Sequence, residues 1–291
     1  MKDQNKVKKH LRIGGQRVYI LRHLVLLVLA AFWLIPIFWL LLSSFSASNS
    51  MSISRFFPEE YSLVQYQKLL LQTDAANQFP RWMLNTTIIA LCNCVISSVF
   101  VLMVAYAMSR MRFAARKPMM NISMILGLFP AFLSMVATYF LLKTLGMRSW
   151  VGLVVVYAGS SGLGYLIAKG FFDTIPKSLD EAARVDGATR FQVFYKVIMP
   201  LSKPIVIYTI LTAFMAPWGD FMFAKYISHG TEAGMNVAVG LQYWISSKTL
   251  ISTNYTMFCA GGVCVALPVT ILFMCLQKYY VEGVTGGAVK G

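Results

Sequence analysis

The feature that most constrains this chain is a series of long apolar stretches that carry almost no charge. About 20 apolar residues in a helix, rising 1.5 Å each, cross the ~30 Å hydrocarbon layer of a bilayer. Because only 13% of the 291 residues are charged, such stretches fill much of the sequence. We therefore predict an all-α, polytopic membrane protein with six transmembrane helices. The six stretches are residues 24–44, 82–109, 118–142, 149–168, 204–224 and 249–277.

Lys and Arg residues are unevenly distributed over the segments that join these stretches. If the N-terminus is cytoplasmic, 19 of the 26 fall on the cytoplasmic side and seven on the outer side. Cytoplasmic loops carry the excess of Lys and Arg, so we predict a multi-pass protein of the cell membrane with both ends in the cytoplasm. Its parts are a basic N-terminus (1–23), a membrane domain (24–277) and a tail (278–291). The net charge of +15 then reflects topology and contact with anionic membrane lipid, and indicates no nucleic-acid partner.

The segment 169–203 differs from the other connections because it is long, amphiphilic and patterned like folded protein. Ser178 and Glu181 have the spacing of a capping box, in which two side chains satisfy backbone amides at the start of a helix. This spacing predicts a short helix that starts at about Leu179. Gly187 is expected to end it, because glycine readily takes up the left-handed conformation of a helix stop.

The predicted short helix carries a stripe of mostly small residues that would lie flush against a partner. A second helix is predicted over residues 190–198, because aromatic and aliphatic residues recur there at helical spacing, and Pro200 is expected to end it. The sequence therefore predicts a helix, a turn and a second helix at the membrane surface. The stripe consists of Leu179, Ala182, Ala183 and Asp186.

Six residues of the segment 169–203 follow the pattern E-A-A-x-x-D-G-A, namely Glu181, Ala182, Ala183, Asp186, Gly187 and Ala188. This pattern resembles the EAA loop of the permeases of binding-protein-dependent ABC importers. Residues 105–113, 129–131 and 283–291 are similar to the carbohydrate branch of that family, and particularly to the second permease of maltose-type importers. The resemblance implies the fold of a type I importer permease, which forms half of the translocation path for a malto-oligosaccharide-like sugar.

The resemblance also implies a set of partners. In that family the EAA loop contacts a separate cytoplasmic ATPase, so we expect the six EAA residues to couple this chain to two copies of such a subunit. A second, different permease and an extracellular sugar-binding protein are expected as well. The sequence has no G-x-x-x-x-G-K-[ST] motif for nucleotide phosphates. We therefore expect a transporter subunit that is not an enzyme and has no cofactor or metal of its own, with ATP and Mg²⁺ on the partner ATPase.

Two further segments contain basic residues, the tail and the connection 110–117. In maltose-type transporters a glycine-rich tail approaches the ATPase, so the resemblance makes Gly286, Gly287 and Lys290 candidates for a second contact, and a flexible terminus is the alternative. The four basic residues of 110–117 are interpreted as orientation charges and no more.

Three residues inside the apolar stretches are candidates for the substrate path. Asp220 is expected to face protein or water, because an ionised acid is costly in the bilayer. Beside Trp218 it would accept hydrogen bonds from a sugar whose ring stacks on the indole. In the alternative that we favour, it pairs with Lys225 or receives the docked binding protein. Asn93 either bridges two helices or meets the substrate.

A secondary transporter for a small polar solute is the alternative function. Such transporters place ionisable residues at mid-membrane and often consist of repeated halves. Here Asp220 lies near the end of its stretch, and the two halves show no convincing repeat. An intramembrane enzyme is disfavoured because none of His10, His23 and His229 lies deep in a stretch.

Overall fold

The computed structural model describes residues 2–49, 56–72, 77–147, 149–161, 164–228 and 235–285. Apart from an isolated β-bridge between Ser46 and Tyr61, these residues contain helices and no strands, which confirms the all-α class. In chain order the helices are α1 (Lys2–Ser44), α2 (Val64–Leu71), α3 (Phe79–Arg110), α4 (Arg116–Gly127), α5 (Ala131–Thr144), α6 (Trp150–Ser160), α7 (Gly164–Thr174), α8 (Lys177–Val185), α9 (Arg190–Gln192), the π-helix η2 (Val193–Ile198), α10 (Met199–Leu201), α11 (Lys203–Gly219), α12 (Met222–Ser228), α13 (Val237–Trp244) and α14 (Lys248–Thr285).

Three helices of the described residues are long and apolar enough to cross a bilayer: Val18–Ser44 in α1, Phe79–Arg110 in α3 and Lys248–Lys278 in α14. Two bent pairs raise the number to five if each pair is one crossing. The α6–α7 pair bends by 44°, and the helical segment Arg190–Leu201 meets α11 at 88°. The first, second and sixth predicted stretches are thus continuous helices, whereas the fourth is a bent pair.

The third predicted stretch, 118–142, is divided by Pro130 into α4 and α5. Proline has no backbone N–H to give to a helix, and it disfavours helical conformation in the residue before it. Pro130 takes the N-cap position of α5 with a ψ of 120°, so the backbone turns there. Neither α4, with 12 residues, nor α5, with 14, is long enough to cross a bilayer alone.

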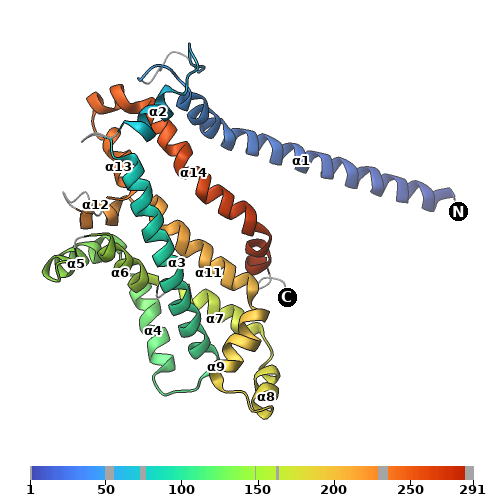
Figure 1. The fold of residues 1–291 in the computed structure, drawn as a ribbon. Coiled ribbons are helices and arrows are strands. Elements are labelled where there is room, and N and C mark those ends of the chain that lie inside the picture. Colours follow the sequence, from blue (N-terminus) through green and yellow to red (C-terminus); the bar gives the residue numbers. More distant parts are fainter. Residues whose placement is uncertain are drawn as a thin grey trace.

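Helix α3 is the centre of the packed body. It contacts α6, α7, α11 and α13, and its buried residues contribute to all three apolar clusters of the described chain. One cluster lies where the C-terminal end of α3 meets α7 and η2, and it includes Phe172, Val193 and Ile198. Figure 1 shows α8 at this end of the molecule and α2 and α13 at the opposite end.

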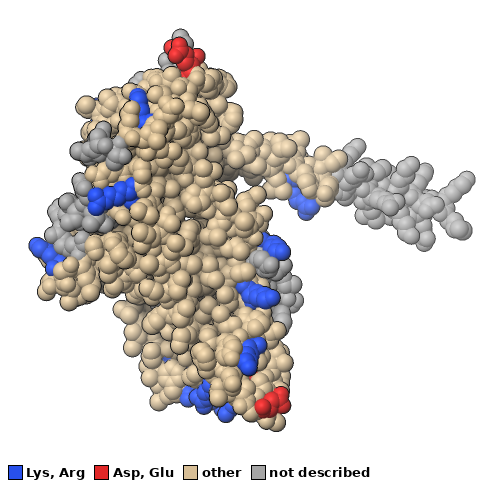
Figure 2. All heavy atoms as spheres, in the orientation of Figure 1, with Lys and Arg blue, Asp and Glu red and all other residues tan. Residues whose placement is uncertain are grey.

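Helix α1 stands apart from this body. It extends away from the other helices (Figure 1), and its main helical neighbour is α14. None of the most apolar window of α1 is buried, and Leu27, Phe32 and Trp33 are 69%, 69% and 74% exposed. On the face drawn in Figure 2, acidic side chains are visible only at the two ends of the molecule, and between them a few Lys and Arg side chains are scattered over an otherwise uncharged surface. An exposed apolar surface as long as that of α1 requires contact with lipid or with another chain.

Candidate functional site

The segment 169–203 contains the two helices predicted for it, but the first helix begins differently. α8 starts at Lys177 directly after Pro176, and no side chain caps it. The predicted capping box of Ser178 and Glu181 is therefore wrong, because Ser178 already lies inside the first turn. Pro176, directly before α8, favours the start of the helix instead, because the fixed φ of proline is compatible with helical conformation.

A capping box is instead present at the start of the second helix. The Thr189 hydroxyl accepts a hydrogen bond from the Gln192 amide at 3.3 Å, and the Thr189 amide donates to Gln192 Oε1 at 2.7 Å. Thr189 and Gln192 have the same spacing as Ser178 and Glu181, so this capping box could also have been predicted from the sequence. The second helix begins at Arg190 as predicted, but it continues through η2 and α10 to Leu201, past Pro200.

Gly187 ends α8 as predicted. Its φ is +86°, in the left-handed region that glycine adopts without a steric penalty. The amide of Ala188 donates to the Ala183 carbonyl at 2.9 Å, and the Gly187 amide donates to the Arg184 carbonyl at 3.1 Å, so the last carbonyls of α8 are satisfied. The chain therefore makes a sharp, fixed turn between α8 and α9.

The six EAA residues lie on two sides of this turn. Glu181, Ala182, Asp186 and Gly187 are exposed. Ala183 and Ala188 instead pack against the apolar cluster below α3, so Ala183 does not belong to the outward stripe predicted for it. Two large apolar side chains join the exposed side, because Val185 is 88% and Phe191 64% exposed.

The last turns of α3 hold this segment in place through three side chains, Tyr106, Ser109 and Arg110, which we call the α3 anchor. The Tyr106 hydroxyl donates to the Arg190 carbonyl at 3.1 Å, and Ser109 Oγ donates to Asp173 Oδ1 at 2.6 Å. Arg110 Nη2 donates to the Ile175 carbonyl at 2.9 Å. The anchor therefore contacts α7, the α7–α8 connection and α9.

Arg110 also forms an ion pair with α8. Its Nε lies 3.2 Å from Asp180 Oδ2, and the two side chains are only 4% and 15% exposed. Burial raises the pKa of Asp180, an effect that the Arg110 guanidinium opposes. The interpretation of 110–117 as orientation charges alone is thus wrong for Arg110, because a guanidinium this deeply buried contributes to the packing of the segment.

The ion pair borders a polar cavity of about 400 Å³ between α3 and the α8–α9 segment. Basic side chains outnumber acidic ones around it. Those basic side chains are Arg110, Arg112, Arg116, Lys177, Arg184 and Arg190, and the acidic ones are Asp180 and Glu181. Among the described residues, no group of three or more His, Cys, Asp and Glu side chains is arranged to hold a metal ion.

Asn93 bridges two helices, which was one of its two predicted roles. Its Nδ2 donates to the Ala213 carbonyl of α11 at 2.6 Å, and its Oδ1 accepts from Ser97 at 2.5 Å. It also borders a second cavity of about 190 Å³ beside the α6–α7 bend, and none of the described residues that line this cavity is charged. The polar residues around it are Asn93, Ser97, Tyr157, Ser160, Ser161, Tyr208, Thr209 and Thr212.

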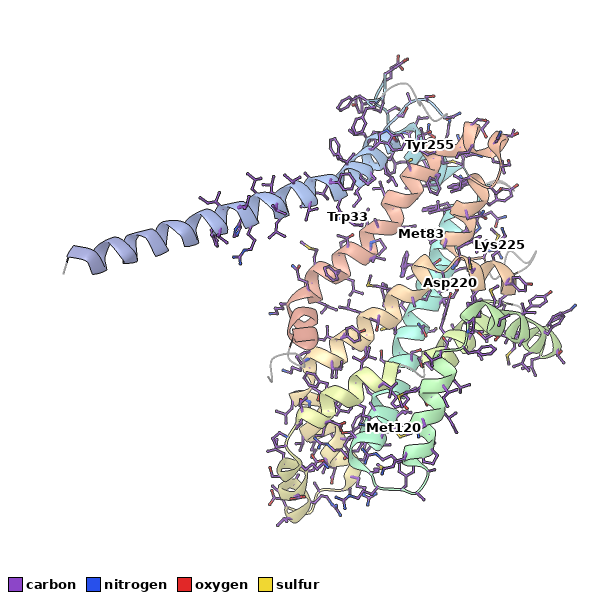
Figure 3. All side chains as sticks on the ribbon, turned by 180° about the vertical axis from the view of Figure 1, so that it is seen from behind. Trp33, Met83, Met120, Asp220, Lys225 and Tyr255 are labelled. Carbon is purple, nitrogen blue, oxygen red and sulfur yellow. The ribbon has the colours of Figure 1, made fainter. Side chains whose placement is uncertain are left out.

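Asp220 does not pair with Lys225, although the two lie close together where α11 passes into α12 (Figure 3). Asp220 Oδ2 accepts from the Tyr157 hydroxyl at 2.6 Å, and Oδ1 accepts from the Phe223 amide at 3.0 Å. Lys225 donates to Gln242 instead. Trp218 is 5% exposed within an apolar cluster, so its indole offers no open face for a sugar ring.

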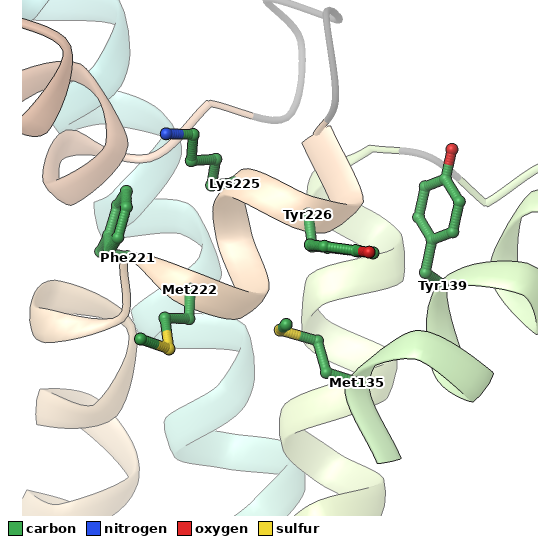
Figure 4. Close-up of a pocket in the computed structure, with 6 residues that line it drawn as sticks. All are labelled: Met135, Tyr139, Phe221, Met222, Lys225 and Tyr226. Carbon is green, nitrogen blue, oxygen red and sulfur yellow. The ribbon is translucent and has the colours of Figure 1, made fainter. Parts of the chain in front are cut away.

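A third cavity, of about 520 Å³, lies between α5 and α12 and was not predicted. Met135 and Tyr139 of α5 face Met222 and Tyr226 of α12 across it (Figure 4). Its lining is mainly apolar. Of the other predicted site residues, Gly286, Gly287 and Lys290 lie outside the described residues.

Comparison with known proteins identifies a matching family and several relatives of this chain. Residues 97–286 match the family of the binding-protein-dependent transport system inner membrane component. The chain is 33% identical to the maltodextrin transport system permease MdxG of Bacillus subtilis over 92% of this chain and 95% of that protein. It is 30% identical to the galactooligosaccharides transport system permease GanQ of the same organism over 98% of both.

A solved structure shares the fold. A chain of a bacterial ABC transporter involved in the import of the acidic polysaccharide alginate superimposes with a TM-score of 0.75 at 24% identity, over 91% of this chain and 98% of the other. The matched residues 97–286 include α8, its Gly187 stop and the α3 anchor. This chain therefore belongs to the family of binding-protein-dependent transport system inner membrane components.

Proposed function

We propose that this chain is a permease subunit of an ATP-driven importer for neutral, malto-oligosaccharide-like sugars and forms half of the translocation path. The observation that carries the proposal is the family match over residues 97–286, which contains α8 with its left-handed stop and its exposed outer side. The relatives named for maltodextrin and galactooligosaccharides support a sugar as substrate.

We propose six crossings of the cell membrane, with both ends of the chain in the cytoplasm. Helices α1, α3 and α14 supply three of them, the α6–α7 pair and α11 with α12 supply two, and α4 with α5 forms the third crossing, bent at Pro130. The excess of Lys and Arg on the segments that would then be cytoplasmic supports this orientation. The open surface of α1 is covered by lipid or by a second, different permease subunit.

The exposed side of the α8–α9 turn is the surface that contacts the ATPase in this proposal. It combines Ala182 and Gly187, which leave room for close approach, with the apolar Val185 and Phe191 and the acidic Asp186. Glu181 lies at the edge of this surface. Two copies of the ATPase bind ATP and Mg²⁺, and this chain holds no cofactor of its own. The tail residues Gly286, Gly287 and Lys290 add a second contact with the ATPase.

The substrate path in this proposal includes the polar cavity beside Asn93. Hydroxyl and amide groups line it, and the absence of a charged lining residue suits a neutral sugar, which forms hydrogen bonds without an ion pair. Asp220 acts on the path indirectly, because it positions the Tyr157 side chain that borders the cavity. An extracellular sugar-binding protein delivers the sugar from outside.

Transport by the reconstituted complex tests the proposal. The chain would be co-expressed with the permease, ATPase and solute-binding protein encoded beside its gene, and the purified complex placed in liposomes. We expect uptake of labelled maltodextrin only with ATP and the binding protein, and no effect of an ionophore that removes ion gradients. Uptake without ATP that the ionophore abolishes would instead identify a secondary transporter.

A further inference from the structure

We propose that Arg110 is a positioning residue for transport, which links α8 to α3 so that a displacement of α8 moves the central helix of the membrane domain. This inference rests on the proposed contact between α8 and the ATPase. The inference identifies the side chain that connects the ATPase-contacting helix α8 to the rest of the permease.

The burial and contacts of Arg110 support this role. Its side chain is 4% exposed and reaches two successive parts of the segment, the Ile175 carbonyl before α8 and Asp180 within α8. A charge this deeply buried is kept only where partners compensate for the lost water. The Arg110 guanidinium is therefore held between α3 and α8, and neither helix can move far without displacing it.

Apart from the ion pair, α8 meets the body mainly at η2, and this contact is shallow. None of the nine residues of α8 is buried, whereas α3 buries 14 of its 32 residues. The apolar contact of α8 with the body comes from Ala183, a side chain of one carbon, which packs only in part against the cluster below α3. Dispersion contacts grow with the number of atoms that meet, so the ion pair with Arg110 makes a large contribution to the attachment.

The ion pair is also incompletely formed. Nε and Nη1 of Arg110 and Oδ1 of Asp180 have no hydrogen-bond partner within the described protein, although all three atoms are buried. A guanidinium and a carboxylate can form two parallel hydrogen bonds. Such a pair would also use Oδ1 and a second guanidinium nitrogen, so the link has a tighter arrangement that the present geometry leaves unused.

Uncoupling of ATP hydrolysis from transport is the test. In the reconstituted complex, Arg110→Gln removes the charge, and Lys117→Gln makes the same change at an exposed position of the same basic segment. We expect the ratio of sugar transported to ATP hydrolysed to fall roughly tenfold in the Arg110 variant, within the usual range of coupling between sites. It should stay at the wild-type value in the Lys117 variant. The ATPase should co-purify with both.

Exchange of the two charges separates a direct link from a general structural defect. The double variant Arg110→Asp with Asp180→Arg should recover part of the ratio lost in each single variant. A wild-type ratio in Arg110→Gln, or a double variant no better than the singles, would overturn the inference. If Arg110→Gln fails to insert, Asp180→Asn takes its place, and normal coupling in that variant overturns the inference equally. Loss of the ATPase from the wild-type complex would instead contradict the proposed function.

Discussion

Two aspartates at different places in this molecule are held in different ways. Asp220, where α11 passes into α12, uses both carboxylate oxygens, one for the Tyr157 hydroxyl and one for the Phe223 amide. Asp180, on α8, places one oxygen 3.2 Å from Arg110, and its other oxygen has no partner within the described residues. Both oxygens of the first carboxylate accept from neutral donors, whereas only one oxygen of the second lies beside its charged partner.

We interpret this difference in contacts as a difference in mobility between the two places. When every donor already has an acceptor, a displacement can only weaken the hydrogen bonds, because each broken bond leaves a buried group unpaired. In an incomplete ion pair, a displacement can instead form a new hydrogen bond. We therefore interpret the α11–α12 junction as a fixed element and α8 as an adjustable one.

The largest expected effect is on the fixed element. Asp220→Ala leaves the Tyr157 hydroxyl and the Phe223 amide without their acceptor, and we expect the free energy of unfolding to fall by about 2–4 kcal/mol. Tyr157→Phe removes only one of the two bonds and should cost about 1 kcal/mol. Thermal unfolding of the purified complex measures both. Equal losses in the two variants would show that the Phe223 contact contributes nothing.

The next prediction compares two glycines with the same backbone conformation. Gly187 and Gly146 both have positive φ, +86° and +70°, and no atom lies within 4 Å of a Cβ built on either. Substitution by Val should therefore strain each site by a similar roughly 1–2 kcal/mol. Only Gly187→Val, at the end of α8, should abolish sugar uptake in the liposome assay. Equal uptake in both variants would contradict a special role for the α8 turn.

A smaller effect tests the helix start found in the structure against the one predicted from sequence. Thr189→Ala removes a side chain that caps α9 and should cost about 1 kcal/mol, whereas Ser178→Ala changes a residue inside α8 and should cost less than about 0.5 kcal/mol. The apparent melting temperatures of the two variants decide the matter. A larger loss for Ser178→Ala would restore the predicted capping box.

The smallest effect on stability is expected for Glu181→Ala. Glu181 is exposed and does not cap α8, so the free energy of unfolding should change by no more than ordinary surface substitutions cause, about 0.5 kcal/mol, with a correspondingly small shift in melting temperature. Any loss of transport would then come from weaker contact with the ATPase. Co-purification of the ATPase measures that contact directly, and a marked drop in melting temperature would show an internal role instead.

Local patterns in the sequence predicted much of the fold. Long apolar runs gave α1, α3 and α14, because length and hydrophobicity alone decide whether a helix can cross a bilayer. Gly187 was predicted as a helix stop since few other residues tolerate its backbone conformation. The EAA pattern led to the family, although four of its six residues are exposed and the other two pack against the core.

The contacts between distant residues could not be predicted. Asp180 is 70 positions after Arg110, and Asp220 is 63 positions after Tyr157, so neither pair leaves a local signal. Charge counting treats every arginine near a span as equivalent, which is why the buried Arg110 was grouped with its exposed neighbours. Pro130 was visible in the sequence, but whether a proline bends or divides a helix depends on the surrounding packing.

The separation of α1 from the body has a consequence for how the chain is made. No residue of α1 belongs to the three apolar clusters of the described chain, and its contacts with other helices are mainly with α14, as in the pair Trp39 and Tyr255, whose rings lie 5.9 Å apart. Because α1 ends at Ser44 and α14 begins only at Lys248, α1 is synthesised long before its main helical neighbour. Until then it lacks that neighbour, a condition that its long run of aliphatic and aromatic residues suits, because lipid can cover their exposed side chains.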